Sequence, residues 1–130
     1  MGSSGYRLDM AASIRRPAVD FRFERATSAA RDARHALRQL KCNVALAHDL
    51  ALVASELVTN VVMHTQRGGR MLAWDTDPVR LEVHDSSPLP PAVTGKQPGG
   101  RGLRIIDAVC SGWGTAIVPT GKVVWAEFDR

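Results

Sequence analysis

A long apolar stretch, residues 44 to 65, constrains the fold of this chain more than any other segment. Asn43 stands directly before it and can cap a helix, and Gly68-Gly69 is expected to end that helix. The aliphatic residues recur at spacings of three and four and therefore share one helical face, which consists of Leu46, Leu50, Val53, Leu57 and Val61. The stretch is predicted to be the long core helix of the chain.

A line of polar residues runs along the same helix. Glu56, Asn60 and His64 follow at intervals of four, and because each residue turns the helix by about 100°, the line drifts by only about 40° per step. Asn60 is expected at the edge of the apolar face, Glu56 farther out and His64 within the face. One interpretation is ordinary helix decoration. The other is a cleft, in which the Asn60 amide oxygen binds Mg²⁺ and Glu56 accepts a hydroxyl proton.

The remaining sequence predicts a mixed fold without internal repeats. A helix is expected from Thr27-Ser28 to about residue 41, and another at 103–109. The proline- and glycine-rich residues 86–102 cannot form a regular element. Alternating apolar and polar residues, turn signals and β-branched residues predict strands at 19–24, 70–74, 79–84, 112–118 and 122–128. This order predicts an α+β fold, a two-layer α/β sandwich whose mostly antiparallel sheet is covered on one face by helices.

Composition bounds the class of protein. The chain has 130 residues, 45% of them hydrophobic, which suits one domain, expected at residues 17–130 after a flexible N-terminal segment at 1–16. No apolar run reaches the roughly 18 residues of a membrane span, so no membrane association is expected. Cys42 and Cys110 are far apart, and buried thiols in a reducing, cytoplasmic compartment are expected. The net charge of +4 could attract nucleic acid or an acidic protein, but the spaced Arg31, Arg34 and Arg38 are most simply a solvated helix face.

Two other segments place polar or flexible residues at the ends of expected elements. Asp85 follows the strand at 79–84, so its carboxylate can be held at a pocket floor, where an adenine amino group would satisfy it. The alternative is an Asx turn that ends the strand. Gly99-Gly100-Arg101-Gly102 opens a helix, where glycines let the backbone approach phosphates and Arg101 can donate two hydrogen bonds. The alternative is a flexible hinge.

Taken in order, these motifs resemble a known superfamily. They are ELVTNVVMH at 56–64, VHDSSP at 83–88, GGRGLRIID at 99–107, WG at 113–114 and GKVVWA at 121–126. Over roughly residues 17 to 128 the chain resembles the ATP-binding proteins of the gyrase, Hsp90, histidine-kinase and MutL superfamily. Its nearest resemblance is to the small bacterial anti-sigma factor serine kinases of actinobacterial type.

The resemblance implies a Bergerat-type ATP-binding fold with ATP and Mg²⁺ as cofactors. It implies that Asn60 coordinates Mg²⁺, that Glu56 is the base that acts on the acceptor hydroxyl, and that Asp85 contacts the adenine. It also implies a phosphate-wrapping lid, with Arg101 at a phosphate-contacting place among Gly99, Gly100 and Gly102. His64 matches a frequent position without an assigned role.

The function implied by the resemblance is an ATP-dependent anti-sigma factor. It would phosphorylate serine or threonine of an anti-anti-sigma protein and bind a sigma factor, regulating transcription by partner switching. Members often dimerise, so a homodimer is also left open, although no self-complementary stripe is visible. A second hypothesis is a non-catalytic module that binds nucleotide, or none, and sequesters a regulator. Direct nucleic-acid binding is disfavoured because no recognition helix or aromatic platform is evident.

Two positions depart from the superfamily pattern. Asp85 is followed by Ser86-Ser87-Pro88, where most members have Asp-x-Gly-x-Gly, and this stiffens the backbone beside the expected adenine site. Gly121 is followed by Lys122, where a threonine is frequent. Related actinobacterial proteins share the Ser-Pro form, so ATP binding remains the expectation.

Overall fold

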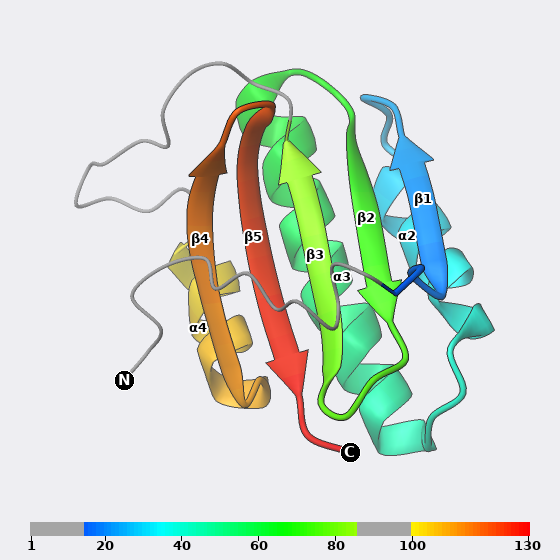
Figure 1. The fold of residues 1–130 in the computed structure, drawn as a ribbon. Helices are drawn as coiled ribbons and strands as arrows, with labels where there is room; N and C mark the ends of the chain where they lie inside the picture. The colour runs from blue at the N-terminus through cyan, green and yellow to red at the C-terminus, as the bar shows by residue number, and fades with distance from the viewer. Residues whose placement is uncertain (1–14, 86–99) are drawn as a thin grey trace.

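The computed structural model describes residues 15–85 and 100–130. Within these ranges, a five-stranded antiparallel sheet has the order β1-β2-β3-β5-β4. All the helices in these ranges lie on one face of the sheet, as Figure 1 shows. The predicted α+β two-layer sandwich is therefore confirmed.

The elements follow the predicted order closely. The helical segments are α2 (Ala29–Ala36), a 3₁₀ turn η1 (Leu37–Gln39), α3 (Val44–Thr65) and α4 (Gly100–Val109). The strands are β1 (Val19–Phe23), β2 (Gly69–Trp74), β3 (Val79–Asp85), β4 (Gly112–Val118) and β5 (Gly121–Phe128). The turn between β2 and β3 contains a cis peptide bond at Asp77-Pro78. The main differences from prediction are an earlier start of α4 and a shorter first helix.

Helix α3 begins and ends through local interactions. The Asn43 side chain accepts a hydrogen bond of 2.8 Å from the Leu46 backbone N–H, as its cap position predicts. The helix ends at Thr65, and Gln66 adopts the left-handed conformation with a φ of 61°. Gly68-Gly69 therefore does not end the helix, contrary to prediction, because Gln66 already does so.

The two glycines instead permit a close approach of backbones. A Cβ atom at Gly68 would lie 2.0 Å from the Phe23 carbonyl oxygen, and one at Gly69 would lie 2.3 Å from the His84 carbonyl oxygen. Both distances are impossible for a side chain. Glycine at these positions thus lets the backbone at the start of β2 lie close to the backbones of β1 and β3.

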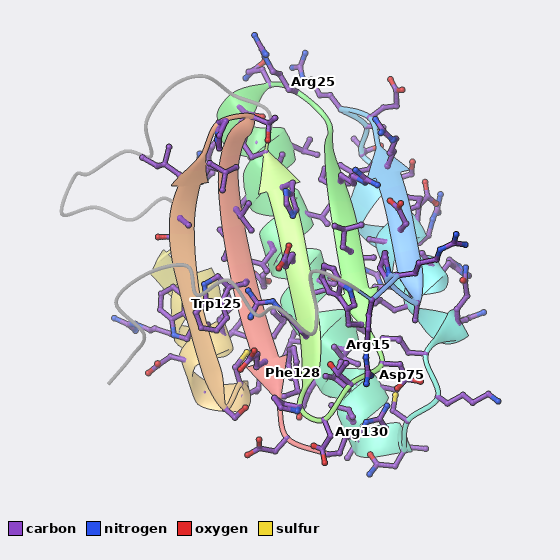
Figure 2. All side chains as sticks on the ribbon, in the orientation of Figure 1. Arg15, Arg25, Asp75, Trp125, Phe128 and Arg130 are labelled. Atoms are coloured by element: carbon purple, nitrogen blue, oxygen red, sulfur yellow. The ribbon has the colours of Figure 1, made fainter. Side chains whose placement is uncertain are left out.

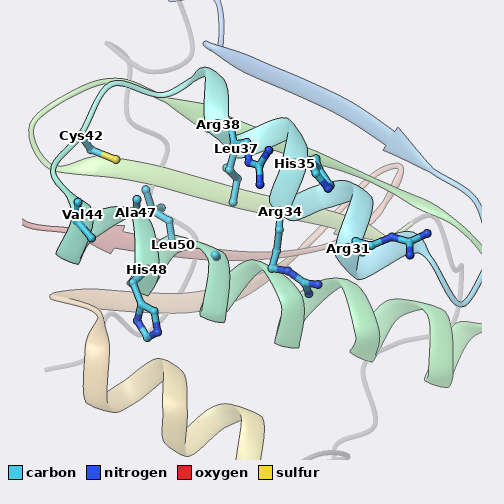
Figure 3. A pocket seen from close by; sticks show the side chains of 11 residues that line it. Arg31, Arg34, His35, Leu37, Arg38, Cys42, Val44, Ala47, His48 and Leu50 are labelled. Atoms are coloured by element: carbon cyan, nitrogen blue, oxygen red, sulfur yellow. The ribbon is translucent and has the colours of Figure 1, made fainter.

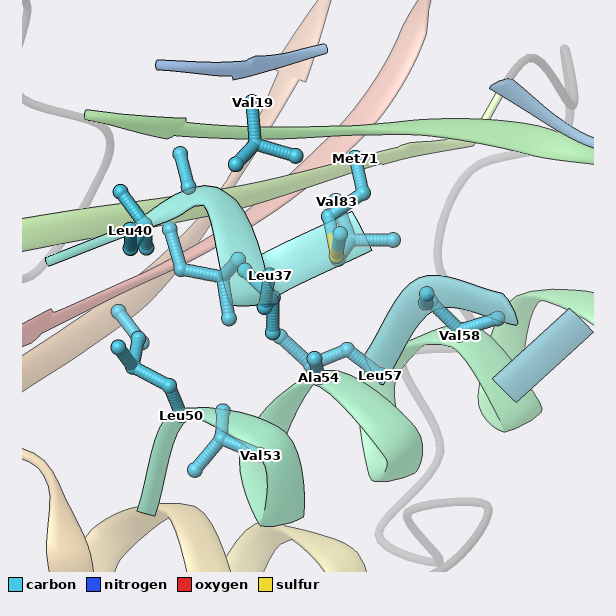
Figure 4. Packing of buried hydrophobic residues seen from close by; sticks show 14 of the residues in the cluster. Val19, Leu37, Leu40, Leu50, Val53, Ala54, Leu57, Val58, Met71 and Val83 are labelled. Carbon is cyan, nitrogen blue, oxygen red and sulfur yellow. The ribbon is translucent and has the colours of Figure 1, made fainter. Parts of the chain in front are cut away.

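The core lies between α3 and the sheet. Every residue of the predicted apolar face of α3 is buried, and Val79, Leu81 and Val83 of β3 point toward it. Figure 4 shows side chains of α3 packed against Leu37 and Leu40, which follow α2, and against Met71 and Val83 of the sheet. By length and composition alone, α3 could also cross a membrane, but its apolar face packs in this core.

The helix-free face of the sheet carries a buried charged cluster that the sequence did not predict. Arg80 is 2% exposed and Glu82 is 4% exposed, although they occupy the polar positions of the alternating strand β3. Arg80 donates hydrogen bonds of 2.9 Å from Nε to Glu82 and from Nη1 to Glu127. Its guanidinium carbon lies 4.8 Å from the ring centroid of Trp125, which Figure 2 labels on this face. The alternation predicted the orientation of these side chains but not their burial.

Both cysteines are free and half-buried, so the predicted burial of the thiols is only partial. Burial raises the pKa of the Cys110 thiol to about 12, with further contributions from Asp49 and Asp107. In a Cys42→Ser variant at pH 8, iodoacetamide is therefore expected to alkylate Cys110 on the order of 10³-fold more slowly than in denaturant. Mass spectrometry of timed samples measures both rates, and a native rate within tenfold of the denatured rate would contradict the expectation.

Candidate functional site

Helix α3 presents the first two candidate residues at the edge of its buried face. Glu56 and Asn60 are both half-buried, one turn apart, in agreement with the predicted polar line. Within the described residues, neither side chain makes a hydrogen bond or an ion pair. A half-buried amide and carboxylate in this state remain available to a ligand.

His64 does not lie in the apolar face, contrary to prediction. It is exposed, one residue before the helix ends. The last buried residue of α3 is Val61, so the apolar surroundings end before the helix reaches His64. His64 therefore does not belong to the buried face of α3.

Asp85 is the last residue of β3 and is 3% exposed. It alternates with Val79, Leu81 and Val83, so it faces the helix layer. Gly69, which opens β2 four residues after α3 ends, pairs with Asp85 across the sheet. The last turns of α3 and the tip of β3 therefore lie at the same end of the domain, as Figure 1 shows.

Lys122 lies beside Asp85. In the sequence it stood out only because a threonine is frequent at its position in the superfamily. The two residues are direct partners across β3 and β5, and the Lys122 Nζ lies 3.7 Å from the Asp85 Oδ2. Both line a hollow of about 550 Å³ at this end of the sheet, and Arg22, Glu24 and Arg70 are the other charged residues that line it. An acceptor and a donor thus stand side by side at the position predicted for base recognition.

Helix α4 begins at Gly100, so the glycine-rich segment does open a helix. The helix packs against α3 and β4, and the Trp113 Nε1 donates a 3.1 Å hydrogen bond to the Asp107 carboxylate near its end. Gly99 and the side chains of residues 100–103, Arg101 and Gly102 among them, lie outside the described part of the structure. Helix α4 as a whole thus packs beside α3, whereas the lid remains a prediction.

The described residues fit a metal ion that takes most of its ligands from phosphates and water, as predicted. In the ranges 15–85 and 104–130, no group of three or more histidine, cysteine or acidic side chains could hold a metal ion by itself. Asn60 offers a single amide oxygen beside Glu56. Such a set fits Mg²⁺ that takes most of its ligands from phosphates and water, since Mg²⁺ dehydrates reluctantly.

A second hollow, of about 490 Å³, lies between α2 and α3 (Figure 3). Arg34 reaches across it and donates a 2.9 Å hydrogen bond from Nη1 to the Ser55 hydroxyl. None of the described residues that line it is acidic; its arginine and histidine side chains are Arg31, Arg34, His35, Arg38 and His48, and its apolar lining includes Leu37, Ala47 and Leu50. We call this hollow the α2–α3 groove. The predicted solvated arginines thus border a concave surface.

Helices on one face of an antiparallel sheet define a two-layer α/β sandwich, with a hollow that includes Asp85 and Lys122 at one end of the sheet. The family model of the histidine kinase-like ATPase domain matches residues 20–128. The chain therefore belongs to the histidine kinase-like ATPase domain family, whose members bind ATP, usually with Mg²⁺. No curated protein sequence matches the chain.

Proposed function

We propose that this ATPase-type domain is a cytoplasmic serine/threonine protein kinase of the anti-sigma factor type. Its substrate would be an anti-anti-sigma protein, and it would bind a sigma factor when that substrate is phosphorylated. The family membership supports the ATP-binding part of this proposal. The observation that carries the kinase part is Glu56, a half-buried carboxylate one helical turn from Asn60 and without a hydrogen bond among the described residues.

The proposed reaction transfers the γ-phosphoryl group of ATP to a serine hydroxyl. The hydroxyl oxygen attacks the phosphorus, its proton passes to the Glu56 carboxylate, and ADP leaves. Asn60 would hold Mg²⁺ through its amide oxygen, and the bound metal would offset phosphate charge. Asp85 accepts a hydrogen bond from the adenine amino group, while Arg101 and the backbone at the start of α4 bind phosphate. Few residues are needed because such transfer depends on positioning and electrostatics.

The α2–α3 groove supports the partner-binding part of the proposal. Its arginines surround an apolar floor, which is the arrangement that favours an acidic protein segment with apolar side chains. The groove is formed by elements other than the tip of β3, so a partner could occupy it while nucleotide is bound. A homodimer remains part of the proposal without a surface assigned to it.

The alternative is a nucleotide-binding module that sequesters a regulator without transferring phosphate. The departure at Ser86-Ser87-Pro88 favours this alternative, because it removes the glycines that accompany the adenine-binding Asp in most members of the superfamily. Transfer of radiolabelled phosphate to a serine-containing partner protein distinguishes the two, since the module would bind ATP without any transfer.

Magnesium-dependent ATP binding is the first expected result. In calorimetric titrations, wild-type protein should bind ATP more tightly with Mg²⁺ than without it, and Asn60→Ala should remove roughly tenfold or more of that gain because a metal ligand is lost. Thr59→Ala is a matched control, since Thr59 is the exposed neighbour of Asn60 on α3. Equal affinities with and without Mg²⁺ in both wild type and Asn60→Ala would show that Asn60 is not a metal ligand.

A further inference from the structure

Asp85 and Lys122 form a pair in which both members are restrained. Their side chains are 3% and 27% exposed, and the Nζ and Oδ2 atoms are 3.7 Å apart. Lys122 alternates along β5 with Val124, Ala126 and Phe128, which pack in or against the core, so its side chain shares the helix-facing side with Asp85. The pair therefore offers an anionic acceptor and a cationic donor to the same side of one ligand.

We propose that Lys122 reads the nucleotide base together with Asp85, by donating a hydrogen bond to the ring nitrogen next to the amino group that Asp85 accepts. This inference rests on the proposed function, because it requires ATP at the tip of β3. Adenine presents an amino donor at its position 6 and a ring acceptor, N1, at the adjacent position. An acceptor beside a donor matches this edge with two hydrogen bonds, and both are charge-assisted.

The same pair would reject guanine in the same ring orientation. Guanine carries a carbonyl acceptor at position 6 and an N–H donor at position 1, so both polarities are reversed relative to adenine. The Asp85 carboxylate would then face a carbonyl oxygen and the Lys122 ammonium would face an N–H group. Facing groups of like polarity repel each other, so Lys122 is a specificity residue for the 6-amino purine.

A simpler role for Lys122 would be to neutralise the buried carboxylate of Asp85. The two roles differ in what they require of the base. A neutralising lysine strengthens binding of any base that donates to Asp85, with or without a nitrogen at position 1. A lysine that recognises the base strengthens binding only of those bases that carry this ring nitrogen.

The test compares ATP with 1-deaza-ATP, in which a C–H group replaces N1 and the amino group remains. Calorimetric titration of wild-type protein should show roughly 10-fold or more tighter binding of ATP, because one charged hydrogen bond is lost with the analogue. In Lys122→Met the two ligands should bind with equal affinity. Lys122→Arg, which keeps a donor, should retain part of the preference for ATP, and GTP competition should become more effective in Lys122→Met than in wild type.

Lys41→Met is the matched control, because Lys41 is exposed and its carbonyl is bonded to Arg130, which follows the opposite end of β5 from Lys122; it should keep the wild-type ratio. Thermal unfolding of Lys122→Met at the wild-type temperature would establish that the variant is folded. An unchanged ratio of the two ligands in Lys122→Met would overturn the inference and leave the neutralising role. Absence of ATP binding to the wild-type protein would instead overturn the proposed function, and the inference with it.

Discussion

Replacing Arg80 with alanine is expected to lower the free energy of unfolding by about 3–5 kcal/mol at pH 7. The substitution leaves Glu82, which is 4% exposed, without its 2.9 Å hydrogen bond to a cation, and it also removes the contact with Trp125. Glu82 would keep its 2.8 Å hydrogen bond with His84, but the desolvation of its buried charge would no longer be offset by the guanidinium. Chemical denaturation with urea measures the change.

The exposed pair Arg70–Asp20 provides a matched control on the same face of the sheet. Its side chains are 42% and 43% exposed, and its closest N–O distance is 2.6 Å, shorter than that of the buried pair. Arg70→Ala should cost about 1 kcal/mol or less, since solvent screens exposed ion pairs. An Arg80→Ala variant no less stable than Arg70→Ala would show that burial does not govern the strength of these pairs.

The effect of Arg80→Ala should also depend on pH. Burial raises the pKa of Glu82, but hydrogen bonds from His84 and Arg80 lower it more, so its folded-state pKa lies below the ordinary value. The cluster therefore contributes stability above the unfolded pKa, and this contribution is lost as the pH falls through the folded pKa. The difference between wild type and Arg80→Ala should be largest near pH 7 and should shrink below about pH 4.

Glu56→Gln is expected to reduce phosphate transfer to a partner serine by about 10²-fold or more while leaving ATP affinity within about twofold. Glutamine keeps the size of the side chain but cannot accept the hydroxyl proton at neutral pH. Transfer in single-turnover reactions and ATP binding by calorimetry should be measured on the same preparations. This pair of measurements separates the chemical step from nucleotide binding.

Asp49→Asn is the appropriate control, because Asp49 lies two turns before Glu56 on nearly the same side of α3. It lines a hollow with Cys110 and Ser111, which the proposed mechanism does not use, so its substitution should leave transfer unchanged. A Glu56→Gln variant with wild-type transfer would remove Glu56 from the proposed mechanism. Loss of transfer together with loss of ATP binding would indicate a structural role instead.

The secondary structure was largely predictable because its signals are local. The cap Asn43, the apolar periodicity of α3 and the alternation in β3 each depend on residues a few positions apart. The first helix was predicted too long, because its last turn tightens into a 3₁₀ turn at Leu37–Gln39. Ser28 does stand at the N-cap of α2, but its side chain makes no capping hydrogen bond.

The residue types of the candidate site were predictable, but the contacts between its residues were predictable only in part. Intervals of four placed Glu56 and Asn60 on one line, and the strand end marked Asp85. The charge partner of Asp85 was not predicted, since the only signal for Lys122 was its place after Gly121 in a hairpin far along the chain. That contact depends on the register of β3 against β5.

The sequence alone determined which segments form helices and strands, because hydrophobic periodicity and capping act over one or two turns of chain. It also determined the ATPase-type motifs that the family match later covered. Only the tertiary structure decided which charges are buried and which carboxylate meets which cation. Arg80 and Glu127 are 47 residues apart, and their contact exists because the pairing of β3 with β5 places them directly opposite each other.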